Sequence, residues 1–108
     1  KTKPEDVVGV YAVSFEIKAD SDYNERYESL VTQLNLKGKM WDETTSFAFV
    51  QTSESLEDFE HRLYFNSKLL DAKDKLLVVD VTDRLGIARG KFVMPTVLQS
   101  IMPKVVQK

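Results

Sequence analysis

Two apolar runs near opposite ends of the chain constrain its fold more than any other feature. Residues 10–17 read Val-Tyr-Ala-Val-Ser-Phe-Glu-Ile, and residues 76–81 read Leu-Leu-Val-Val-Asp-Val. β-Branched and aromatic side chains favour strands, and strands this apolar are usually central strands with both faces covered. We therefore expect a sheet that has both segments in its interior.

The first of two amphipathic helix patterns follows the helix-start signal Asp-Ser-Asp at residues 20–22. Its apolar residues recur at helical spacing and are Tyr23, Tyr27, Leu30, Val31 and Leu34. Glu25, Arg26 and Glu28 are expected to face solvent. Gly38 is expected to end this segment, because glycine adopts a positive φ without steric cost.

The second helix pattern begins after residues 52–55, which supply capping side chains. Leu56, Phe59 and Leu63 form its apolar stripe. The charged residues between them are expected to face water, and these are Glu57, Asp58, Glu60 and Arg62. The sequence therefore predicts a helix that packs through one face only.

Further strands are expected between and after the helices. Residues 46–51 alternate as a strand, residues 39–44 suggest a short edge strand, and residues 87–92 a fifth strand. The order strand, helix, strands, helix, strand is that of a ferredoxin-like βαββαβ sandwich. We predict an α+β fold of this kind, with an antiparallel sheet of four or five strands and two helices on one face.

Composition is that of one ordinary globular domain. The chain has 108 residues, no cysteine and a net charge of −2. It therefore has no disulfide framework, and its overall charge does not attract nucleic acid or anionic membranes. We expect a cytoplasmic protein, no membrane partner, one domain over residues 7–92, and a C-terminal tail over residues 93–108. The tail contains a short helix pattern, and one interpretation packs it on a dimer partner.

The first apolar run has two unlike faces. The larger side chains, Tyr11, Val13, Phe15 and Ile17, are expected to meet the helices. The opposite face carries smaller side chains. We expect Val10, Ala12 and Ser14 on this face to contact a second subunit and form a homodimer interface.

Two strand-end acids, Glu16 and Asp80, have a chemical role to consider, and Glu16 is the stronger candidate. It ends the first strand on the smaller face, where a two-fold axis would bring two copies together. Two close carboxylates share a proton or bind a divalent cation. The sequence leaves open a catalytic or metal-binding Glu16, with magnesium or manganese as cofactor, beside an ordinary solvated acid.

The sequence predicts different roles for the other polar and aromatic candidates. Arg84 and Arg89 flank the turn after the last apolar run and are candidates for nucleic-acid phosphate contact. His61, the only histidine, is expected on a helix surface. Phe47 and Phe49 are expected in the core rather than on a base-stacking surface, which needs interleaved Arg or Lys.

Three segments together resemble the CRISPR-associated protein 2 superfamily. Residues 11–17 (Tyr-Ala-Val-Ser-Phe-Glu-Ile) look like its first strand, residues 41–50 like its central hairpin, and residues 74–82 like its fourth strand. The resemblance covers about residues 10–92, and it is greatest for the stand-alone, CRISPR-like relatives.

This resemblance implies a ferredoxin-like homodimer that binds DNA as a scaffold or acts as a metal-dependent nuclease. The family's acid at the end of strand one corresponds to Glu16, where members favour Asp. We expect a non-catalytic dimeric interaction or scaffold module. The alternatives are an RNA or DNA endonuclease with Glu16 paired across the dimer, and a small-ligand regulatory domain.

Overall fold

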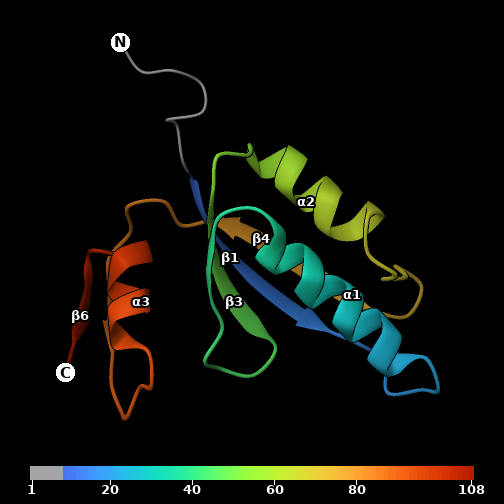
Figure 1. The fold of residues 1–108 in the computed structure, drawn as a ribbon, viewed down its shortest axis with the longest axis horizontal. Coiled ribbons are helices and arrows are strands. Elements are labelled where there is room, and N and C mark those ends of the chain that lie inside the picture. Colours follow the sequence, from blue (N-terminus) through green and yellow to red (C-terminus); the bar gives the residue numbers. More distant parts are fainter. Residues whose placement is uncertain (1–8) are drawn as a thin grey trace.

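The structure, a computed structural model, describes residues 9–108 and shows a mixed α+β fold (Figure 1). Its elements are β1 (Gly9–Glu16), α1 (Tyr23–Leu36), β2 (Lys39–Trp41), β3 (Phe47–Thr52), α2 (Leu56–Phe65), β4 (Lys75–Asp80), β5 (Gly86–Ala88), α3 (Pro95–Ile101) and β6 (Val105–Gln107). The expected start of the first strand at residues 7 and 8 lies outside the described residues. The predicted order of the first six elements is confirmed.

The main sheet has four antiparallel strands in the order β2-β3-β1-β4. β1 lies in the interior, paired with β3 on one side and β4 on the other, as its apolar sequence predicts. The expectation that the second apolar run is an interior strand is wrong. β4 is an edge strand, and its Leu77 and Val79 side chains are 61% and 46% exposed.

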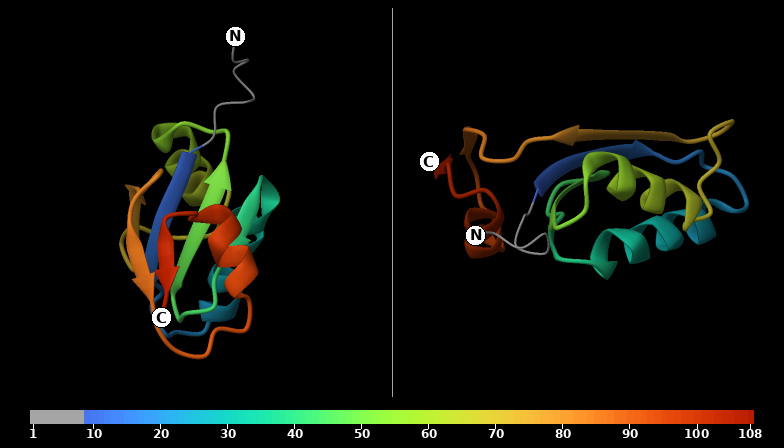
Figure 2. Two further views of the ribbon diagram at one scale, coloured as in Figure 1. Left: turned by 90° about the vertical axis from the view of Figure 1, so that its left-hand side faces the viewer. Right: turned by 90° about the horizontal axis from the view of Figure 1, so that it is seen from above.

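α1 and α2 pack together on one face of the sheet, as the views from above and from the side show (Figure 2). The larger side chains of β1 point to them, so the predicted orientation of β1 is confirmed. The core on this side also contains Leu30 and Leu34 from α1, Phe59 and Leu63 from α2, and Ala48 and Val50 from β3. Phe59 stacks on the Tyr11 ring with centroids 5.0 Å apart.

Residues 86–108 form a separate C-terminal unit. β5 pairs with β6 in a parallel two-stranded sheet, and α3 connects them. The predicted fifth strand therefore exists only as Gly86–Ala88 and does not extend the main sheet. In Figure 1, α3 and β6 lie on one side of the strands, and α1 and α2 on the other.

The C-terminal unit packs against its own chain's sheet and forms a second apolar core. This core contains Val10, Trp41, Ala88, Leu98, Ile101, Met102 and Val105. The tail packs on its own chain's sheet, and Val10 is buried beneath it. Contact of the tail with a dimer partner stays a prediction. The helix pattern in the tail is confirmed as α3.

Candidate interaction surface

The C-terminal unit covers only part of the sheet face that α1 and α2 leave free. The register places Ala12 opposite Val79 and Ser14 opposite Leu77, so these four side chains share that face. Ser14, Leu77 and Val79 are exposed and Ala12 is half-buried. We call Ala12, Ser14, Leu77 and Val79 the open-face patch. Of the three residues predicted at a dimer interface, Ala12 and Ser14 lie in this patch, and Val10 does not.

Glu16 ends β1 beside this patch, directly opposite Lys75 of β4. Its carboxylate lies 3.1 Å from the Lys75 ammonium, and both side chains are largely exposed. A solvated pair of this kind contributes only about 0–1 kcal/mol to stability. Within residues 9–108, no group of three or more acidic or histidine side chains is close enough to hold a metal ion.

The two arginines predicted to contact nucleic acid occupy different places. Arg84 lies in the loop between β4 and β5 and lines a groove between the sheet and the C-terminal unit. Arg89 directly follows β5 and does not line that groove. Both side chains are exposed.

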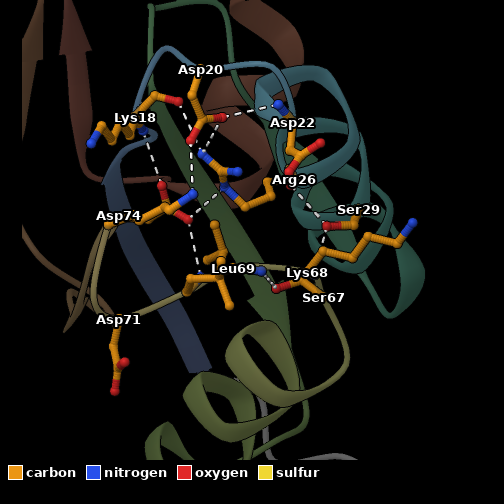
Figure 3. Close-up of polar contacts among 12 residues, drawn as sticks. Lys18, Asp20, Asp22, Arg26, Ser29, Ser67, Lys68, Leu69, Asp71 and Asp74 are labelled. Atoms are coloured by element: carbon orange, nitrogen blue, oxygen red, sulfur yellow. Dashed lines mark hydrogen bonds and ion pairs between the residues drawn. The ribbon is translucent and has the colours of Figure 1, made fainter.

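A buried ion-pair network ties α1 to the segment before β4 (Figure 3). Arg26 is 2% exposed and Asp74 is 8% exposed. The Arg26 Nε donates to Asp74 Oδ2 at 3.0 Å, and its Nη2 lies 3.1 Å from Asp20 Oδ1. Asp74 also accepts hydrogen bonds from the amides of Lys18 and Leu70, each at 3.0 Å.

These contacts set the charge state of both acids. Burial by itself would raise the pKa of Asp74, but the amides of Leu70 and Lys18 and the charge of Arg26 lower that pKa below its ordinary value. Asp20 has a lowered pKa for similar reasons: burial opposes the shift, and bonds from Lys73 and Arg26 outweigh it. The network is therefore charged at neutral pH, and it links α1 to the end of β1 and to the segment before β4.

A second buried arginine joins α2 to the end of β3. Arg62 makes a two-point contact with Glu54, with Nε–Oε2 and Nη2–Oε1 distances both 2.8 Å. The hydrogen bonds from Arg62 lower the pKa of Glu54, although burial opposes this shift. Thr52 also donates to Glu54 at 2.9 Å.

The expectation that Arg26 and Arg62 face water is wrong. Each lies on the apolar stripe of its helix, because Arg26 is one turn before Leu30 and Arg62 is three residues after Phe59. This spacing was the available sequence signal. The spacing indicates buried arginines only once the distant acids Asp74 and Glu54 are known to lie beside them. His61 is exposed as predicted, whereas Trp41 near the sheet edge is buried.

No helix within residues 9–108 has both the length and the apolar character to cross a membrane. No protein-family model, curated protein or solved structure shows a significant match to the chain.

Proposed function

We propose that this chain is a ferredoxin-like, non-catalytic interaction module that forms a homodimer through the open-face patch. The observation that carries this proposal is the exposure of Leu77 and Val79 on a regular sheet face. Removal of apolar area from water contributes about 25 cal/mol per Å². A flat apolar surface on an ordered sheet is therefore a suitable surface for a partner.

A second copy of the chain fits this patch chemically. Around a two-fold axis, each copy presents the same surface, so the surface must complement itself. The patch is mostly apolar, with Ser14 as its one hydroxyl, and an acid and a base, Glu16 and Lys75, lie at one end. Glu16 of one copy can pair with Lys75 of the other, which keeps both charges partnered. The resemblance to CRISPR-associated protein 2 supports the same arrangement.

The test is the molar mass in solution at micromolar concentration, measured by light scattering after size exclusion. We expect a dimer for the unmodified chain and a monomer for Leu77→Glu, because the substitution puts two like charges in the interface. Phe65→Glu is the matched control, since Phe65 is similarly exposed, at 63%, but lies on α2 away from the patch. A monomeric parent, or a dimer that survives Leu77→Glu, would contradict the proposal.

A metal-dependent nuclease is the second candidate, favoured by the position of Glu16 on the same face as the patch. Dimerisation there would bring two Glu16 carboxylates into one neighbourhood, and magnesium or manganese would bind through their oxygens. Metal binding there requires each Glu16 carboxylate to break its ion pair with Lys75. Cleavage of RNA or DNA that requires manganese and disappears in Glu16→Gln would favour this candidate; cleavage that survives in Glu16→Gln would exclude Glu16 as its source.

A further inference from the structure

A groove of about 310 Å³ lies between the sheet and the C-terminal unit. Its aromatic wall contains Trp41, Phe47, Phe49 and Phe92. The Trp41 ring centroid lies 5.8 Å from that of Phe49 and 5.9 Å from that of Phe92. Its other lining residues are mostly apolar and include Val81, Leu85 and Ile87. A space this size is at the lower end of the range of small-molecule sites, which is about 300–1,000 Å³.

The groove carries few polar groups, and among the described residues Arg84 is the only charged one that lines it. Within residues 9–108, Arg84 makes no ion pair with a carboxylate within 4 Å. The charge of Arg84 helps to lower the pKa of Asp80, but the hydrogen bonds that Asp80 accepts come from the Thr82 amide and hydroxyl. Thr44 adds a neutral hydroxyl to the lining.

Trp41, which lines this groove, also carries a buried polar group without a partner in the described part of the chain. Its side chain is 3% exposed, yet its indole Nε1 has no hydrogen-bond partner among the described residues. Buried indole N–H groups usually find an acceptor, because an unpaired buried donor has lost its bond to water. The surrounding side chains shield this donor from solvent, so an acceptor reaches it only when the ring or its neighbours shift.

We propose that this groove binds a small aromatic carboxylate. The aromatic body lies among Trp41, Phe47 and Phe49, where ring-to-ring contacts are favourable. The carboxylate meets the Arg84 guanidinium, which presents paired donors to such groups. The site is built from one chain, so it does not rest on the proposed dimer.

Trp41 is the only tryptophan, so it reports directly on this site. The experiment follows its single indole N–H signal by NMR of the ¹⁵N-labelled full chain during titration with 2-naphthoate, and Trp41→Phe confirms the assignment. We expect a saturable shift of that signal. The neutral probe 2-naphthalenemethanol is expected to bind about tenfold more weakly, which corresponds to about 1.4 kcal/mol.

Arg84→Gln and Arg89→Gln form a matched pair, since both residues are exposed and only Arg84 lines the groove. Arg84→Gln is expected to weaken 2-naphthoate binding about tenfold and to leave the neutral probe unchanged, whereas Arg89→Gln changes neither. The proposal is overturned if millimolar 2-naphthoate does not move the Trp41 signal. It is also overturned if both substitutions weaken binding equally, because the attraction would then be general rather than local.

Discussion

At the scale of single residues, the most consequential feature is the burial of Arg26 with Asp74. The Asp74 carboxylate accepts hydrogen bonds from two backbone amides and from the Arg26 Nε–H. These donors come from three segments: the residues after β1, the segment before β4, and α1. One Arg26 nitrogen, Nη1, is buried without a partner among the described residues. The pair therefore specifies how α1, the end of β1 and the segment before β4 meet, at some cost in desolvation.

We expect Asp74→Asn to lower the free energy of unfolding by about 3–5 kcal/mol, because it leaves the Arg26 charge buried without its main counter-charge. Asp71→Asn is the control, since Asp71 is exposed three residues earlier in the same segment. That substitution is expected to change stability by less than about 0.5 kcal/mol. Urea unfolding of both variants measures the difference, and equal effects would show that the network contributes nothing specific.

At the scale of elements, the link from α1 to β2 depends on backbone conformation. Gly38 has a φ of +98°, which confirms its expected role. A Cβ placed there would lie 1.9 Å from the Gln51 carbonyl oxygen of β3. Gly90 has a φ of +121° but open space around its Cα. Substitutions at these two glycines therefore distinguish destabilisation by backbone strain from destabilisation by steric overlap.

Gly38→Ala is expected to destabilise the chain by more than Gly90→Ala. Both replacements carry the strain of a left-handed residue, about 1–2 kcal/mol, but only Gly38→Ala also forces β2 and β3 apart. Thermal unfolding of the two variants makes the comparison. If Gly90→Ala lowers the midpoint as much as Gly38→Ala, close approach to β3 is not the reason for glycine at position 38.

At the scale of the whole molecule, two apolar cores lie on opposite sides of one sheet. The acids paired with buried arginines, Asp74 and Glu54, lie where α1 and α2 meet the rest of the chain. Asp74 and Glu54 both have a pKa below the ordinary value. Because their folded pKa values lie below their unfolded values, the folded state binds fewer protons than the unfolded state at pH values near 4. Their stabilising effect is therefore present above the unfolded pKa values, about 3.9 for Asp and 4.3 for Glu, and is lost below them.

We expect the free energy of unfolding to be nearly constant from about pH 7 to 5 and to fall steeply below about pH 4. Denaturant unfolding across that range tests the sign and position of the fall. In Asp74→Asn the fall should be shallower, because one of the responsible carboxyl groups is gone. A stability that rises on acidification would contradict the charge states assigned to Asp74 and Glu54.

Periodicity in the sequence was enough to determine β1, α1, β3, α2 and β4, and to orient β1 with Tyr11 and Val13 toward the helices. These are local properties, because a strand alternates every two residues and a helix repeats every 3.6. The α+β class follows from the order of the elements. Ala12 and Ser14 were likewise placed correctly on the face opposite the helices.

Only the tertiary structure decided which segments meet. It placed β4 at an edge, paired β5 with β6 away from the main sheet, and covered Val10 with the C-terminal unit. It also buried Arg26 against Asp74, 48 positions away. Such choices depend on packing and charge pairing between residues that are distant in sequence. No local sequence pattern encodes these long-range contacts. Each buried residue needs a partner from a distant segment, and only the folded chain brings that partner to it.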